Sequence, residues 1–322
     1  MKETRKGGVE LMSNPTGTLS ARRAQDRPQW MRQWLSAETG LAWLFLLPSL
    51  IGFVTFYAVP AVRGVLISFT NWDLLSPPKV VGLANYQKLF ADAQFWQALR
   101  VTIYYVLLNI PLQTALAVGM AVLMDRLTQS IFVRGILLLP WLIPSVVVAL
   151  LWLWLLDPAL GLANQILAIF GIPHQPFVGS VGGAMPVIAG VNIWRYAGYT
   201  AILIFAGLQT IPKDVYEAGA IDGATEARMF WSITIPLLRP VLVFVLVTTV
   251  IGSFQIFDTI AIMTQGGPVN ATRVIFWYIY EFAFNRFQMG YAMAAAVVLF
   301  LILLAMTLLQ MRFLRADESD LA

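Results

Sequence analysis

The sequence predicts an all-α membrane protein with six transmembrane helices, and three observations carry that prediction. Of its 322 residues, 59% are hydrophobic and only 12% are charged, with a mean hydropathy of +0.73. Soluble globular domains are about 25% charged. Disorder is excluded by the 13% aromatic content, because disordered chains contain few aromatic residues. The third observation is that long uncharged stretches recur along the chain, each about 20 residues long, as a helix needs to cross a bilayer.

Six such stretches give the predicted spans. Their approximate bounds are 41–62, 101–124, 135–156, 187–209, 237–262 and 287–311. Prolines fall inside these runs at Pro48, Pro111, Pro140 and Pro144. Such prolines would break a soluble helix, but neighbouring helices in a membrane bundle can satisfy the carbonyl groups that proline frees.

The distribution of basic residues predicts the orientation of the spans. With the N-terminus inside, fourteen Lys and Arg residues lie on the inner side and six on the outer side, and Arg195 lies within the membrane. An excess of basic residues marks cytoplasmic loops. We therefore expect both termini in the cytoplasm. The net charge of +4 then comes mostly from basic residues on the cytoplasmic side of the membrane. The sequence indicates no basic patch for binding nucleic acid.

Three regions make up the expected domain organisation. Residues 1–40 form a basic cytoplasmic tail that ends in a short amphipathic segment with Trp30, Met31, Trp34 and Leu35. This tail has no apolar core of the kind that marks a cleavable signal peptide. Residues 41–314 form the transmembrane domain, and 315–322 form a second cytoplasmic tail. The outer segments 68–97, 157–185 and 264–286 are expected to serve as caps or docking surfaces.

Several kinds of chemistry are improbable for this composition. The chain has no cysteine and one histidine, His174, which argues against disulfides, thiolate metal sites and a catalytic relay through histidine. His174 is expected to be a surface loop residue. None of the five lysines follows a glycine, so the chain lacks the phosphate loop of a nucleotide hydrolase. The sequence predicts no catalytic residue and no metal ligand.

Polar residues within the spans are the candidates for a solute pathway, because charge inside a membrane is costly and usually functional. The candidates in the second, fourth and fifth spans are Asn109, Gln113, Asn192, Arg195, Tyr196, Tyr199, Phe254, Gln255, Phe257 and Asp258. Phe254 and Phe257 could stack on sugar faces. Two structural alternatives remain open. Arg195 and Asp258 could pair with each other, and Asn109 and Gln113 could simply hold helices together by hydrogen bonds.

The segment 211–240 between the fourth and fifth spans is the most informative part of the chain. It contains Asp214, Glu217, Asp222 and Glu226 within 13 positions. A short helix is expected after Pro212, then a turn near Gly219 and Gly223, then a second helical piece over 225–231. A small helix-turn-helix presented to the cytoplasm is suited to docking into the groove of a partner.

This loop resembles the EAA motif of ATP-binding-cassette importer permeases. The matching residues are Glu217, Ala218, Gly219, Asp222, Gly223, Ala224, Phe230, Ile233, Ile235 and Pro236. Gly219 and Ile235 depart from the usual alanine and leucine. The resemblance continues over most of 41–314, including Gly82-Leu83-Ala84-Asn85-Tyr86, Ala206-Gly207-Leu208-Gln209 and Thr264-Gln265-Gly266-Gly267-Pro268. As a set these motifs resemble carbohydrate-uptake permeases of the maltose and glycerol-3-phosphate type, and the Thr-x-Gly-Gly-Pro segment resembles the first of their two permease subunits.

The resemblance implies a function for the chain as well as a fold. It implies a permease bundle in the cytoplasmic (inner) membrane whose coupling helix docks on an ATP-hydrolysing subunit, with Glu217 as the charged contact. The implied partners are two cytoplasmic ATP-binding subunits, a second permease chain in a heterodimer, and an extracytoplasmic binding protein that delivers a sugar-like solute. ATP and magnesium would bind the partner ATPase, so this chain would bind no cofactor and would not be an enzyme.

Two other functional classes fit the sequence less well. A secondary transporter or channel predicts paired repeats and several acidic residues within the membrane, but Asp258 is the only acid near a span interior. An intramembrane enzyme needs a catalytic pair or metal cluster, which one histidine and no cysteine make improbable.

Overall fold

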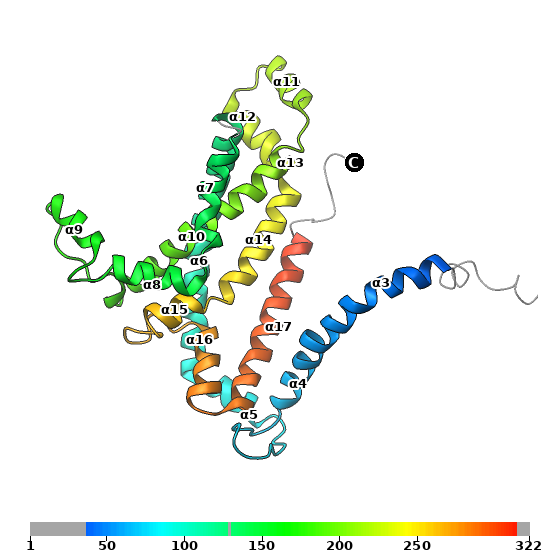
Figure 1. Ribbon diagram of the computed structural model, residues 1–322, viewed down its shortest axis with the longest axis vertical. Helices are drawn as coiled ribbons and strands as arrows, with labels where there is room; N and C mark the ends of the chain where they lie inside the picture. The colour runs from blue at the N-terminus through cyan, green and yellow to red at the C-terminus, as the bar shows by residue number, and fades with distance from the viewer. Residues whose placement is uncertain (1–36, 128–129, 314–322) are drawn as a thin grey trace, which may run out of the picture. The chain divides into compact units, whose positions relative to one another are not determined.

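The computed structural model describes residues 37–127 and 130–313, and side chains from Leu41 onward. Within these ranges the regular elements are helices, apart from one isolated antiparallel bridge between Thr70 and Val80 (Figure 1). The predicted all-helical fold is confirmed. The expected amphipathic segment with Trp30 and Trp34, and the expected tail 315–322, lie outside the described residues.

The chain divides into two compact units, with the boundary between Arg63 and Gly64. Within the described part of the first unit, α3 (Ala37–Phe53) continues through Pro48 into a π-helical turn, η1 (Val54–Ala58), and then into α4 (Val59–Ile67). α4 crosses the boundary between the units. The stretch Leu41–Ile67 is apolar and long enough to span a membrane.

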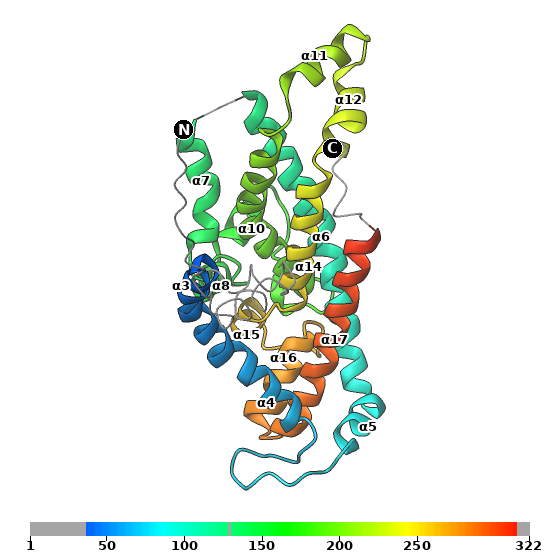
Figure 2. The ribbon, with the colours of Figure 1, turned by 90° about the vertical axis from the view of Figure 1, so that its right-hand side faces the viewer.

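The second unit holds the remaining helices. In chain order these are α5 (Ala84–Ala91), α6 (Ala93–Leu127), α7 (Ile131–Leu142), α8 (Ser145–Leu155), α9 (Leu162–Ile169), η2 (Phe177–Gly179), α10 (Ala184–Leu208), α11 (Lys213–Ile221), α12 (Glu226–Met229), η3 (Phe230–Thr234), α13 (Ile235–Leu237), α14 (Arg239–Phe254), α15 (Asp258–Met263), α16 (Ile275–Tyr280), η4 (Glu281–Asn285) and α17 (Met289–Phe313). α6, α10, α14 and α17 run along the length of this unit, with α11 at one end and α5 at the other (Figures 1 and 2).

Five helical stretches of the described chain are long and apolar enough to cross a membrane. They are Leu41–Ile67, Ala93–Leu127, Ala184–Leu208, Arg239–Met263 and Met289–Phe313, and each contains most of one predicted span. The chain over the predicted third span, 135–156, is not one continuous helix. α7 and α8 meet there at a 90° bend, so this stretch is either one broken span or a re-entrant segment.

Pro140 and Pro144 show how the bend is placed. Pro140 lies inside α7 and does not end it, whereas Pro144 caps the start of α8 directly after the break. The fifth span also has an irregularity that the hydropathy pattern does not predict. α14 ends at Phe254 and α15 begins at Asp258, so residues 255–257 form a short non-helical break.

α10 is the central helix of the second unit. In its most apolar window 56% of residues are buried, against 28 to 33% in the windows of α6, of 239–263 and of α17. It packs on α6, α7 and α14. The crossing with α7 is close, because a Cβ added at Gly198 would lie 1.8 Å from the carbonyl oxygen of Leu137. Small residues allow this approach between membrane helices.

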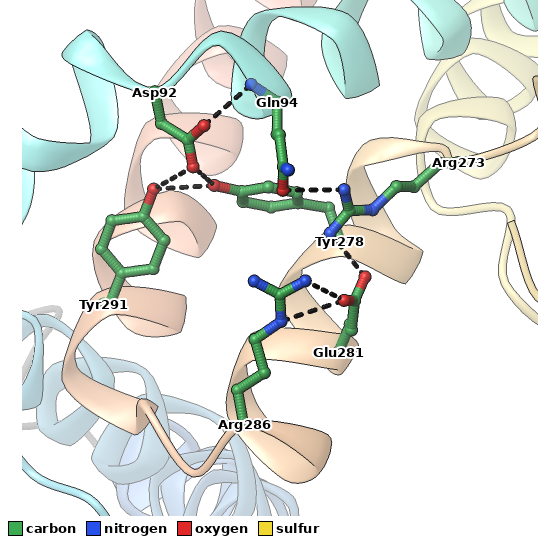
Figure 3. Close-up of polar contacts among 7 residues, drawn as sticks. All are labelled: Asp92, Gln94, Arg273, Tyr278, Glu281, Arg286 and Tyr291. Carbon is green, nitrogen blue, oxygen red and sulfur yellow. Dashed lines mark hydrogen bonds and ion pairs between the residues drawn. The ribbon is translucent and has the colours of Figure 1, made fainter. Parts of the chain in front are cut away.

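A network of polar side chains ties α16 and α17 to the start of α6. The hydroxyl groups of Tyr278 and Tyr291 donate to one carboxylate oxygen of Asp92, at 2.7 and 2.9 Å (Figure 3). The other oxygen of Asp92 accepts from the backbone N–H of Gln94 at 2.8 Å. Asp92 therefore joins the start of α6 to α16 and α17, through contacts that span 186 and 199 residues of sequence.

Candidate functional site

A central cavity of about 290 Å³ opens among α6, α10, α14, the start of α8 and the break before α15. Nine of the ten side chains predicted for a solute pathway line it. These are Asn109, Gln113, Asn192, Arg195, Tyr196, Tyr199, Gln255, Phe257 and Asp258. The tenth, Phe254, does not line the cavity. Its ring is 2% exposed and packs in the hydrophobic core with Tyr105 and Val250.

Amide side chains on α6 connect that helix to its two neighbours. The Asn109 amide donates to Gln113 at 3.0 Å and to the Ser253 hydroxyl on α14 at 3.2 Å. The Gln113 amide donates to the Thr200 hydroxyl on α10 at 3.0 Å. Asn109 and Gln113 thus hold helices together, as one expectation had it, and they also line the cavity. The buried carbonyl oxygen of Asn109 has no hydrogen-bond partner among the described residues.

Arg195 holds the bend between α7 and α8. Its guanidinium donates to the Ile143 carbonyl at 3.1 Å, to the Ser145 hydroxyl at 2.8 Å and to the Tyr196 hydroxyl at 3.0 Å. The bend frees backbone groups that water cannot reach in a membrane, so a side-chain donor there is stabilising. The ion pairs of the described chain do not include one between Arg195 and Asp258, so the expectation that these two pair is not borne out.

Asp258 reaches the cavity because the helix is broken in front of it. Phe257 has φ −141° and ψ −59°, which interrupts the helical path, and Asp258 then starts α15. Beside it, the Thr259 hydroxyl accepts from the Asn192 amide at 3.2 Å. The cavity therefore combines a paired guanidinium, a carboxylate without an ion-pair partner in the described chain, amides, hydroxyls and aromatic rings.

Segment 211–240 forms the predicted pair of short helices at the opposite end of the unit from α5 (Figures 1 and 2). Gly223 turns the chain with φ +76°, a conformation that glycine adopts without strain. The side chain of Thr225 accepts from the backbone N–H of Arg228 and caps α12. The Tyr216 hydroxyl lies 3.1 Å from the Thr234 hydroxyl, which ties α11 back to η3.

Three side chains of segment 211–240 are exposed and are not used in contacts within the segment. Glu217 and Asp222 are exposed, and their carboxylates make no hydrogen bond or ion pair with the described residues; Ile221 is 88% exposed. Gly219 instead faces inward, where an added Cβ would meet the end of Ile233 at 2.9 Å. An ion pair between Arg126 and Glu226 braces the loop against the end of α6. The loop thus presents two free carboxylates and an apolar side chain on a braced support.

Comparison with known proteins identifies the family. The family described as "Binding-protein-dependent transport system inner membrane component" matches residues 113–316. The chain belongs to this family. The permease is 32% identical over 277 residues to the "Trehalose/maltose transport system permease protein MalF" of Thermococcus litoralis, covering 85% of this chain and 94% of that one.

A second relative and a solved structure agree with the family. The "Sulfoquinovosyl glycerol transport system permease protein SmoG" of Agrobacterium fabrum is 32% identical to the permease over 295 residues, covering 90% and 96% of the two chains. A bacterial ABC transporter that imports the acidic polysaccharide alginate includes a chain with the same fold, at a TM-score of 0.77 and 24% identity, covering 90% of the permease and 99% of that chain.

These findings establish the class of the protein. The permease is a multi-pass inner-membrane subunit of a binding-protein-dependent ABC importer, and ATP hydrolysis resides on separate subunits of such importers. The importer complex includes a periplasmic binding protein and ATPase subunits. In the part of the chain that the structure describes, no group of three or more His, Asp or Glu residues could hold a metal ion.

Some residues of the cavity were not selected from the sequence. Thr200 lies one turn beyond Tyr196 on α10, so the helical spacing of Asn192, Tyr196 and Thr200 was an available signal. Ser145 and Ser253 carried no such signal, because their positions depend on the bend before α8 and on the packing of α14 against α6.

Proposed function

We propose that this permease carries a sugar or sugar-like solute through the central cavity. Support comes from the lining of that cavity, where amides, hydroxyls and Arg195 lie beside the rings of Tyr196, Tyr199 and Phe257. Hydrogen-bonding groups suit hydroxyl-rich solutes, and aromatic faces suit the apolar faces of sugar rings. The two named relatives are described as transporters of trehalose or maltose and of sulfoquinovosyl glycerol.

We further propose that segment 211–240 is the coupling element. Its EAA-like residues Glu217, Asp222 and Gly223 are exposed, and a partner ATPase would bind the free carboxylates and Ile221. Closure of two ATPase subunits would then be transmitted through α11 and η3 into α14. In this arrangement both chain termini lie in the cytoplasm, and the permease is the first-type subunit of a heterodimer with a second permease chain.

The experiment is transport by the importer reconstituted in liposomes from the permease, its partner permease, the ATPase and the binding protein. Wild-type uptake is measured with trehalose, maltose and sn-glycerol 3-phosphate. Glu217→Arg should abolish both uptake and the stimulation of ATP hydrolysis by the binding protein, whereas Glu217→Gln should reduce them partially. Arg312→Glu is the matched control, since it reverses one exposed charge on α17 outside the loop.

Two results would contradict the proposal. Uptake that continues without ATP, or that is unaffected by Glu217→Arg, would remove the coupling role of this loop. Import of none of the three solutes by an importer whose ATPase responds to its binding protein would remove the sugar class.

A further inference from the structure

A second pocket, here called the outer pocket, lies between the start of α6 and the segment that leads from α15 to α17. Its volume is about 530 Å³, which is within the range of small-molecule sites. It is lined by Gln94, Gln265, Asn270, Arg273, Trp277, Glu281, Asn285 and Arg286. These residues lie in segments 68–97 and 264–286, which the sequence predicted only as caps or docking surfaces, and the function proposed above does not use them.

The floor of the outer pocket is a fixed polar framework (Figure 3). Arg273 is 5% exposed, and its guanidinium donates to the Gln94 side chain at 2.9 Å and to the Glu281 carboxylate at 2.5 Å. Arg286 binds the same carboxylate, with its Nε 3.0 Å from Oε1. One carboxylate is thus shared by two guanidinium groups, so the charged side chains that line the pocket sum to +1, while Asp92 lies outside the lining, bonded to Gln94 and Tyr278. The buried Nε–H of Arg273 has no partner among the described residues.

The rim of the outer pocket consists of exposed side chains whose polar groups make no hydrogen bond with other described residues. Gln265, Asn270 and Asn285 are exposed, and their amides make no hydrogen bond with the described residues. Each amide can donate and accept. The rim and the framework together offer donors, acceptors and one surplus positive charge around a space large enough for a sugar ring.

An aromatic contact joins the outer pocket to the central cavity. Phe257 lines the central cavity and Trp277 lines the outer pocket. Their rings stack with centroids 6.0 Å apart and planes inclined by 29°, and Tyr280 packs against both, at 5.0 and 5.4 Å. These three rings, here called the aromatic partition, therefore connect the lining of one pocket to the lining of the other.

We propose that the outer pocket is a loading subsite for a hydroxyl-rich ring solute, neutral or anionic, and that the aromatic partition separates this subsite from the central cavity. This inference rests on the proposed function, because it adds an earlier station on the same route. The amides and the Arg273 Nε–H bind hydroxyl or acidic groups of the solute, and the Trp277 ring covers an apolar face. The surplus positive charge disfavours cationic solutes.

The absence of cysteine from the chain provides a direct test in the permease assembled with its partner permease and the ATPase. Single variants Asn285→Cys and Gln265→Cys place one thiol at the rim, and Val269→Cys is the matched control. Val269 is on the same loop, is 83% exposed, does not line the pocket and has φ +49°, close to the +50° of Gln265. Alkylation by N-ethylmaleimide is timed with trehalose, with glucuronate and with glucosamine, in the absence of the binding protein.

Trehalose or glucuronate should slow alkylation at positions 285 and 265 by about half when half of the sites are occupied, while position 269 should be unaffected and glucosamine should protect least. Adding Trp277→Ala should remove the protection. In transport assays Trp277→Ala should raise the KM for the solute severalfold with a retained maximal rate.

The outcomes separate this inference from the proposed function. If wild type imports a solute that protects neither position 285 nor position 265, the loading subsite is wrong while the proposed function stands. If alkylation at the rim abolishes stimulation of the ATPase by the binding protein, the outer pocket is a docking surface for that protein and the subsite is again wrong. Protection is measured without transport, so failure of wild type to import these solutes contradicts only the proposed function.

Discussion

The guanidinium of Arg195 on α10 donates to the carbonyl oxygen of Ile143 at 3.1 Å, and this contact fixes the 90° bend between α7 and α8. Arg195 is charged and lies within the membrane because its guanidinium supplies a hydrogen bond to a backbone carbonyl that the bend leaves without a helical partner. The same side chain lines the central cavity, so the group that holds the bend also faces the proposed route of the solute.

Replacement of Arg195 should therefore lower the stability of the protein, in addition to any effect on solute transport. Arg195→Lys keeps the charge but cannot reach both Ile143 and Ser145, and we expect a loss of about 1.5 to 3 kcal/mol for each charged hydrogen bond removed. Thermal unfolding of the detergent-purified importer checks this. Asp258→Asn is the control and should leave the unfolding temperature nearly unchanged. Equal destabilisation by both changes would point instead to an Arg195–Asp258 pair.

Gly198→Ala should disrupt the crossing of α10 and α7. The added Cβ would lie 1.8 Å from the Leu137 carbonyl oxygen, and a backbone atom cannot move aside without shifting the helix. Overpacking of this kind costs about 1 to 3 kcal/mol or more. Gly190→Ala on the same helix meets nothing within 4 Å and should be neutral or mildly stabilising. Unfolding temperatures that do not separate the two variants would contradict the close crossing.

The two glycines of segment 211–240 should respond differently to alanine. Gly219→Ala meets the flexible end of Ile233 at 2.9 Å and the side chain of Met229 at 3.5 Å, so it should retain most of the ATPase response to the binding protein. Gly223→Ala has open space but a φ of +76°, and the left-handed conformation costs a residue with a Cβ about 1 to 2 kcal/mol. We expect weaker coupling in that variant. A loss of coupling in Gly219→Ala alone would show that the turn at Gly223 is not what limits docking.

Acid should weaken the junction at Asp92. Burial opposes ionisation of this carboxyl, but hydrogen bonds from Tyr278, the Gln94 N–H and Tyr291, with the charge of Arg273, lower its pKa below 3.8. A lowered pKa in the folded state means that the ionised carboxylate stabilises the fold above pH 3.8 and that this contribution is lost as the pH falls through the folded pKa. The difference in unfolding temperature between wild type and Asp92→Asn should be constant from pH 7 to about 5 and shrink below 3.8. A difference that grows in acid would contradict the assignment.

Periodicity, hydropathy and local residue preferences were sufficient for the long helices and for the short helices of segment 211–240. Five predicted spans lie largely within helices, and the turn at Gly223 and the cap at Thr225 follow from residue types with known local preferences. Nine of the ten candidates that were chosen as polar or aromatic residues within the spans line one cavity. Phe254 was misplaced because it lies about one turn after Val250, on the face of α14 that packs in the hydrophobic core. Hydropathy does not distinguish that face from the face that lines the cavity.

The sequence by itself determined that the chain crosses a membrane as helices, because burial of apolar side chains in lipid and satisfaction of every backbone group leave few alternatives. Only the tertiary structure decided where those helices break and which polar groups meet. The bend follows Ile143 and not Pro140, and a guanidinium 52 residues away satisfies the carbonyl there. Gln94 and Arg273 meet across 179 residues, a contact that depends on how α6 and the segment before α16 pack together and that no local pattern encodes.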